Sequence, residues 1–308
     1  MFLNNEGIYN TSEKSARYTE MKPSEEEKAL YTKWKEIYKK LIIDLVQTDK
    51  RYEKLSKKQI DTLSNENARY LISLFTPYVS IEYTASLQQL NYINYFAKLF
   101  VQQNENTDNP FIRECVKVLR EFSSALPKKF SIEGLNPAAK SREFSLLGTR
   151  EHLEEFGETY SINYEASFAS LAQSHRHRIN DYEIMFLDTP KYYIPMIIRG
   201  TLYEDEWLKD ISSLSHLYPQ GMLIKVNEQG NIKKLIAKCK ERLCGRAQLE
   251  TAMITKESLT RYLEAVKDIP VLYNELLPYS HGPKCTFHDF KCNEPCVFGE
   301  KYGLDRII

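Results

Sequence analysis

Residues 173–178, Gln-Ser-His-Arg-His-Arg, carry more information about fold and function than any other stretch of the chain. An arginine guanidinium offers planar, paired N–H donors, and a histidine ring can donate a hydrogen bond from either nitrogen. The row Arg176, His177 and Arg178 therefore suits a bound phosphate or a cofactor that carries a pyrophosphate. An isolated run of this kind is more typical of a solvated basic turn, so its meaning depends on the rest of the sequence.

Helical signals dominate the first part of the chain. Ser24 and Glu27 form a capping box ahead of apolar residues that are spaced for one face of a helix. Ser56 and Gln59 repeat this start signal. Pro110 stands where a helix accepts proline and opens a further apolar run. These patterns predict a series of helices before residue 125.

The second part of the chain mixes both kinds of pattern. Residues 192–203 and 221–228 are β-like in composition, and helical periodicity returns from about 231 to 277. Periodicity fades between about 125 and 160, where prolines and glycines gather. The sequence therefore predicts a helix-rich α+β protein in two halves.

Composition excludes several classes of protein. The 308 residues are 42% hydrophobic and 27% charged, which is ordinary for a chain that buries a core. Lys plus Arg and Asp plus Glu both number 42, so net charge does not indicate nucleic acid or an acidic membrane as a partner. The N-terminus has neither the basic nor the apolar region of a secretory signal, and the six cysteines do not suggest a disulfide framework. We expect a cytoplasmic protein.

The stretch 173–178 resembles the first half of the signature of the flavin-dependent thymidylate synthases, in which Gln, two residues and Arg-His-Arg precede Glu-x-Ser-x-Arg-Tyr. The second half does not follow here, because the corresponding positions hold Ile184, Phe186 and Asp188. It stands near the N-terminus instead, in the residues Glu13, Ser15, Arg17 and Tyr18, and there the Arg-His-Arg positions hold Asn5, Glu6 and Gly7. One signature is divided between two places.

The same division recurs downstream. The family has an Arg before a short apolar stretch and Tyr-Thr, and the first half matches it with Arg69 and Tyr83-Thr84. The family then has Asn-x-Arg and an Arg five residues before Ala-Gln-x-Glu. The second half matches these positions with Asn231, Lys233, Arg242 and Ala247-Gln248-Leu-Glu250. In the first half the equivalents are Ser86, Gln88 and Ala97.

The resemblance implies two fused, divergent copies of one domain. Residues 1–125 form the first copy, 126–159 a linker, 160–280 the second copy and 281–308 a Cys-rich tail. Each copy is expected to hold an antiparallel sheet with helices, so that one chain is a pseudodimer. The family assembles each active site from residues of different subunits of a tetramer. The residues retained in the two copies are complementary, so together they are expected to form one composite site per chain. Two chains are then expected to associate as a homodimer of pseudodimers.

The resemblance also implies a chemistry and residue roles. The family methylates dUMP, taking the carbon from methylenetetrahydrofolate and hydride from reduced FAD, which NADPH restores. The residues expected to contact FAD are Glu13, Arg176, His177, Arg178 and Asn231. Those expected to bind the nucleotide are Ser15, Arg17, Arg69, Gln173, Arg176 and Arg242. Of these, Arg242 and Ser15 are expected to act in catalysis, with Arg242 stabilising charge on a pyrimidine carbonyl.

Departures from the family pattern leave alternatives open. Lys233 stands where the family has an Arg, and Ala237 where it often has Asn. A lysine neutralises charge but lacks the bidentate fork. There are two alternatives: a related modification such as hydroxymethylation, and a decayed relative that only binds nucleotide. The sequence leaves open whether the N-terminus is shortened. A nucleic-acid-binding module is disfavoured by the neutral net charge.

The tail offers a separate hypothesis. Cys285, His288, Cys292 and Cys296 supply four potential ligands within twelve residues, which could close a tetrahedral zinc site. The alternative is a Cys-bearing ending like that of some longer family members, with Gly282-Pro283-Lys-Cys285 as the local match. Cys115, Cys239 and Cys244 lie on or beside apolar helical faces and are expected to be core thiols.

Overall fold

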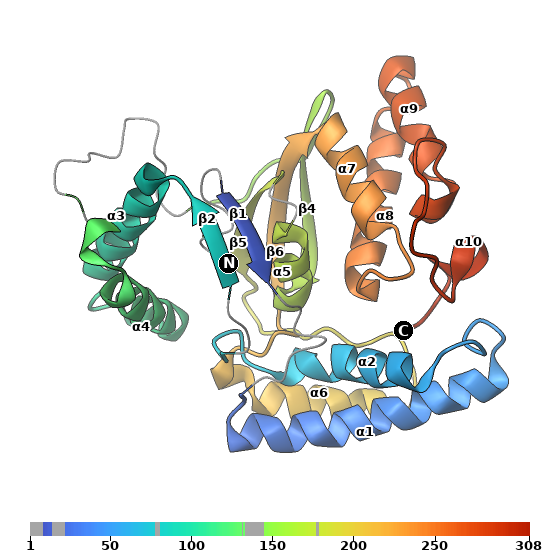
Figure 1. Ribbon diagram of the computed structural model, residues 1–308, viewed down its shortest axis with the longest axis horizontal. Coiled ribbons are helices and arrows are strands. Elements are labelled where there is room, and N and C mark those ends of the chain that lie inside the picture. The colour runs from blue at the N-terminus through green and yellow to red at the C-terminus, as the bar shows by residue number, and fades with distance from the viewer. Residues whose placement is uncertain (1–8, 14–21, 78–80, 131, 133–144, 177–178) are drawn as a thin grey trace.

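The computed structural model describes residues 9–13, 22–77, 81–130, 132, 145–176 and 179–308, with backbone alone for 9–13 and 81. Within these residues the chain is an α+β protein with ten α-helices and a four-stranded antiparallel sheet, which confirms the α+β part of the prediction. Helices of the first half lie below and to one side of the sheet, and the helices that follow residue 231, labelled α7 to α10, lie on its other side (Figure 1).

A helical layer is built from both halves. It contains α1 (Glu25–Thr48), α2 (Lys57–Ala68) and α6 (Tyr203–Ser213), which lie together at the bottom of Figure 1. The capping boxes predicted at Ser24 and Ser56 are both present and open α1 and α2. Trp34 of α1 and Trp207 of α6 are fully buried and meet edge to face with ring centroids 4.9 Å apart. This contact fixes a helix of the first half against one of the second.

The main sheet lies in the second half. It contains β3 (Glu155–Phe156), β4 (Thr159–Ser167), β5 (Asp181–Phe186) and β6 (Leu223–Asn231), in the order β3-β4-β6-β5. The strand predicted at 221–228 is confirmed by β6. The β-like reading of 192–203 is wrong, because this stretch forms turns and then enters α6 at Tyr203. Pro195 cannot donate to a ladder and Gly200 has a φ of 71°, so the segment turns and keeps a single bridge, between Tyr192 and Met222.

A smaller, two-stranded sheet belongs to the first half. β1 (Tyr9–Glu13) pairs antiparallel with β2 (Ile81–Ala85), and Glu13 stands opposite Ile81. After β2 come α3 (Leu87–Gln103) and α4 (Pro110–Ala125), which form an antiparallel pair at the left of Figure 1. Pro110 occupies the first turn of α4, as predicted.

Four helices follow the strands of the main sheet. They are α5 (Phe168–His175), α7 (Ile232–Arg242), α8 (Leu249–Ala265) and α9 (Pro270–Leu276). α7 and α8 pack on the sheet through a buried cluster that includes Ile162, Leu235 and Leu259. The helical prediction for 231–277 is confirmed, because α7, α8 and α9 occupy most of it.

The two halves are joined by a short antiparallel contact. Leu74 N donates to Tyr218 O at 2.9 Å, and Gln220 N donates to Ile72 O at 2.8 Å. Ser73 and Pro219 stand opposite each other between these two bonds. Residues 72–74 of the first half thus pair antiparallel with residues 218–220 of the second half.

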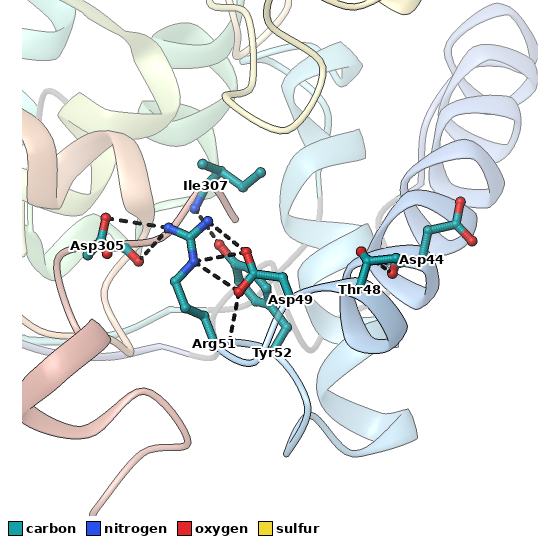
Figure 2. A network of polar contacts seen from close by, with 7 residues as sticks. All are labelled: Asp44, Thr48, Asp49, Arg51, Tyr52, Asp305 and Ile307. Carbon is teal, nitrogen blue, oxygen red and sulfur yellow. Dashed lines mark hydrogen bonds and ion pairs between the residues drawn. The ribbon is translucent and has the colours of Figure 1, made fainter.

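The end of the chain returns to the helical layer. The Arg51 guanidinium donates to the Asp49 carboxylate and to the backbone oxygen of Asp305, while Tyr52 Oη accepts from Ile307 N at 2.8 Å (Figure 2). Ahead of these contacts, the helical turn α10 (Gly299–Tyr302) follows the buried Phe298. In the part of the chain that is described, no helix has both the length and the apolar character to cross a bilayer.

Candidate functional site

Two of the residues predicted for the nucleotide site are in direct contact. Arg242 is the last residue of α7, and Nη2 of its guanidinium donates to the backbone oxygen of Gln173 at 2.5 Å. Gln173 is buried in the last turns of α5. Arg176 follows directly at the C-terminal cap of this helix and is half-buried. The structure therefore gathers Gln173, Arg176 and Arg242 at one end of α5.

A buried histidine stands at the same end of α5. His175 is 1% exposed, and among the described residues neither of its ring nitrogens has a hydrogen-bond partner. Its ring packs edge to face against Tyr182, with centroids 4.8 Å apart. Burial lowers the pKa of His175 to about 3, so the ring is neutral near pH 7. In a neutral ring one nitrogen is a donor and the other an acceptor.

A fully buried carboxylate connects the sheet to α7. Glu228 on β6 accepts hydrogen bonds from Tyr160 Oη at 2.7 Å, Tyr164 Oη at 2.7 Å and Asn180 Nδ2 at 2.9 Å. Its other partner is the ammonium group of Lys238 on α7, at 2.5 Å, and both charged side chains are 0% exposed. Burial and the Glu228 charge raise the pKa of Tyr160 and Tyr164 well above the ordinary value. All four neighbours are therefore donors, which is the arrangement that an ionised buried carboxylate needs.

A second buried network joins the first half to the Ala-Gln-x-Glu motif. Arg69 Nη2 donates to Gln248 Oε1 at 2.6 Å, and Tyr70 Oη donates to Glu250 Oε2 at 2.8 Å. Glu250 also accepts from the backbone N–H and the hydroxyl of Ser167, which caps α5. Burial is the largest cause of a raised pKa at Glu250. The motif is thus a structural link between Arg69 and the helix that carries Gln173.

The remaining predicted residues lie elsewhere or outside the description. Asn231 caps the start of α7, where its Oδ1 accepts from Lys234 N at 3.0 Å. Arg242 ends the same helix, so roughly 15 Å of helix separates these two residues. Ser15, Arg17, His177 and Arg178 lie outside the described residues, and Glu13 is described by its backbone alone.

The cysteines divide into two groups. Cys115 and Cys239 are buried, which confirms them as core thiols, and burial raises the pKa of each to about 12. Cys244 is only half-buried, as are Cys285, Cys292 and Cys296 of the tail. Among the described residues, no three His, Cys, Asp or Glu side chains are placed to hold a metal ion. The zinc site stays a prediction from spacing, without geometric support.

Sequence reasoning missed Glu228, Lys238 and His175. One signal was available for Lys238, because it shares the buried face of α7 with Leu235 and Cys239 and so interrupts an apolar stripe with a charge. A charge on a buried stripe requires a partner, which is a pointer to Glu228. No local pattern distinguished His175 from its exposed counterparts.

Comparisons with known proteins identify no relative. No family model, no curated protein and no solved structure matches this chain. The resemblance to flavin-dependent thymidylate synthases therefore rests on the motifs and on what their geometry supports.

Proposed function

We propose that this protein is a flavin-dependent enzyme that modifies a pyrimidine deoxynucleotide, with methylation of dUMP by methylenetetrahydrofolate and NADPH as the leading reaction. The proposal includes the duplication, in which residues 1–125 and 160–280 are two copies that share one composite site. It draws its support from strand register, from the contact between the halves and from the arginines around α5.

Strand register supports the duplication that the proposal includes. The divided signature aligns Glu13 with Ile184, and the downstream motif aligns Ser86 with Asn231. Five residues before the latter pair stand Ile81 and Val226, which are therefore equivalent as well. In the small sheet Glu13 lies opposite Ile81, and in the main sheet Ile184 lies opposite Val226. The two motif alignments made from the sequence thus give the same strand register in both sheets. A shift of one residue in an alignment would place the aligned side chains on opposite faces of a strand.

The contact between the halves has the form expected of related copies. A two-fold interface brings equivalent patches together and makes their contacts reciprocal. Ser73 stands thirteen residues before Ser86, and Tyr218 stands thirteen residues before Asn231, so Ser73 and Tyr218 are equivalent in the motif alignment. Ser73 pairs with Pro219, which is one residue away from its equivalent. The two flanking hydrogen bonds run in opposite directions between the halves.

The residues around α5 fit the proposed ligands. Arg176, at the C-terminal cap of α5, is suited to a group rich in acceptor oxygens, such as the pyrophosphate of FAD. FAD, when bound, supplies the hydride chemistry. Arg242 is held by the Gln173 backbone, which orients its guanidinium for charge that develops on a pyrimidine carbonyl. No cysteine nucleophile is required by this route.

One observation favours a second candidate, a nucleotide-binding relative without turnover. Arg69 is 3% exposed and its guanidinium is engaged with Gln248, so it is not presented to a phosphate. Binding of dUMP without product formation would select this candidate over the enzyme.

Turnover is the test. The protein supplied with FAD, NADPH, labelled methylenetetrahydrofolate and dUMP is expected to transfer label to the nucleotide and to oxidise NADPH faster when dUMP is present. Arg242→Gln should lose about a hundred-fold or more of this rate, as an oxyanion-type donor does. Arg246→Gln is the matched control, because Arg246 lies four residues away and pairs with the exposed Glu294. Equal rates for both variants would contradict the assigned role of Arg242.

A further inference from the structure

An apolar cavity that the proposed chemistry does not use lies between α4 of the first half and α5 of the second. Its walls come from these two helices, from β5 and from the segments 74–75 and 146–147. The cavity has a volume of about 240 Å³. Val118 of α4 belongs to its wall and is 44% exposed, so the cavity reaches the surface beside this side chain. A small molecule can therefore enter from solvent.

Three phenylalanine rings form one part of the wall. The ring centroid of Phe111 lies 5.5 Å from that of Phe75 and 6.1 Å from that of Phe168. The planes of Phe111 and Phe168 are only 9° apart, and these two side chains are buried. Aromatic rings attract one another at such separations beyond the effect of their buried area. A flat ring that enters the cavity therefore meets aromatic groups that are already held in place by the core.

The lining carries no charge. None of the described side chains that line the cavity is an Asp, Glu, Lys, Arg or His. Cys115 contributes a thiol, and burial raises its pKa to about 12, so the thiol is neutral near pH 7. A charged ligand would lose its hydration here without gaining a partner. The cavity therefore favours an uncharged molecule.

One polar side chain in the wall is unused. Gln220 lines the cavity and is 8% exposed. Its backbone is fixed, because its N–H donates to Ile72 O at 2.8 Å and its carbonyl oxygen accepts from Ala169 N at 3.0 Å. Its side-chain amide makes no hydrogen bond with any residue that the structure describes. A nearly buried amide without a partner costs free energy, and a ligand group that bonds to it removes this cost.

We propose that this cavity binds a flat, uncharged molecule of two fused rings that carries a single N–H or O–H donor, as in indole or 2-naphthol. The phenylalanine rings contact the ligand, and the amide oxygen of Gln220 accepts from its donor. An apolar cavity of about 150 Å³ holds benzene, so a cavity of about 240 Å³ has room for a second ring. The proposal does not depend on the flavin chemistry.

Calorimetric titration with indole and with 2-naphthol tests the site. At least one of them should bind, and the tighter of the two identifies the preferred donor. Indole-2-carboxylate should bind at least about ten-fold more weakly than indole, because the lining offers no cation. Ala172→Leu places a larger side chain in the wall and should weaken binding at least about ten-fold. Ala125→Leu is the matched control, since Ala125 is exposed at the end of α4 and should leave binding unchanged.

The amide is tested by a comparison of two ligands. Indene has the shape of indole without the N–H, and it should bind about two- to ten-fold more weakly. In Gln220→Leu this difference should disappear, because the variant has no group to accept from the N–H. A difference that persists in Gln220→Leu would overturn the role of the amide. Thermal unfolding of each variant checks that it is folded.

Further outcomes separate this site from the proposed nucleotide site. Saturating dUMP and FAD should leave the binding of indole unchanged, whether or not the protein is a flavin enzyme. Competition by either would place indole in the nucleotide site and overturn the proposal. So would the absence of binding by both indole and 2-naphthol at about 1 mM, or equal affinity of Ala172→Leu and the unsubstituted protein.

Discussion

On the proposed duplication the two sheets share a register, but they differ in what surrounds them. In the first half, β1 and β2 form a ribbon of two strands, and Glu82 and Thr84 of β2 are exposed. In the second half, β5 and β6 belong to a four-stranded sheet, and the residues aligned with Glu82 and Thr84 are the buried Asn227 and the half-buried Gln229. A two-stranded ribbon has little stability of its own. The β1–β2 ribbon therefore needs support from the rest of the chain.

The same contrast holds for the charged residues. By the motif alignment, Tyr83 takes the place of the buried Glu228, and the buried Ala97 takes the place of Arg242. The first half does contain residues that contact the second half, because Arg69 and Tyr70 donate hydrogen bonds to the Ala-Gln-x-Glu motif there. On the proposed duplication, the first copy has lost the residues of its own site and retains the residues that contact the second copy.

The largest expected effect breaks the helical layer that both halves share. Trp34→Ala removes a fully buried ring that packs on Trp207 and donates to Asp210 at 2.8 Å. The free energy of unfolding should fall by about 3–5 kcal/mol in urea denaturation, in one cooperative transition. Leu87→Ala, at a side chain 48% exposed, should change it by less than about 0.5 kcal/mol. Two separate transitions would show that the halves are independent.

The next effect concerns the charge pair that the first half lacks. Lys238→Met leaves Glu228 buried without its cation and should cost about 3–5 kcal/mol. The double variant Lys238→Met with Glu228→Leu should recover a large part of this loss, because neither charge is then buried. Tyr83→Phe at the equivalent position should cost less than about 1 kcal/mol. A double variant no more stable than Lys238→Met alone would mean that Glu228 is held by its tyrosines.

A pH effect follows from His175. Its pKa is lowered to about 3 in the folded protein, against about 6.5 in an unfolded chain, so the unfolded state binds more protons in between. Stability should therefore fall as the pH drops below about 6.5, by up to about 1.4 kcal/mol per unit. His175→Gln should flatten this slope between pH 6 and about pH 4, while His216→Gln, at an exposed ring, should not. An unchanged slope in His175→Gln would assign the acid sensitivity to other groups.

The smallest effect concerns the tail. Tyr52→Phe removes the hydroxyl that accepts from Ile307 N in the network of Figure 2 and should cost about 1 kcal/mol. Tyr302→Phe, at a half-buried ring in the tail, is the matched control and should be close to neutral. Equal stability of both variants would show that the tail is held by its apolar contacts.

Local signals predicted the elements they control directly. The capping boxes at Ser24 and Ser56 and the proline at 110 placed three helix starts, because caps act over three or four residues. The β-like stretch at 192–203 failed, since apolar composition there serves the helical core around Trp207, to which Ile197 and Ile198 contribute, and not a sheet. Composition alone does not specify which core a residue joins.

The candidate site was predicted in part. The contact of Arg242 with Gln173 joins two residues that the motifs had singled out. The partners of Glu228 come from positions 160, 164, 180 and 238, and only the pairing of β4 with β6 brings them together. The charge of Lys238 on a buried stripe was a local signal that a partner exists, but the identity of the partners depends on long-range strand pairing, so the network as a whole could not be predicted from the sequence.

The most direct test of the composite site is the visible absorption spectrum of the purified protein, followed by titration with FAD. A flavin spectrum, or stoichiometric uptake of one FAD per chain that weakens in Arg176→Gln and not in Arg246→Gln, is the expected result. A colourless protein that takes up no FAD would contradict the account.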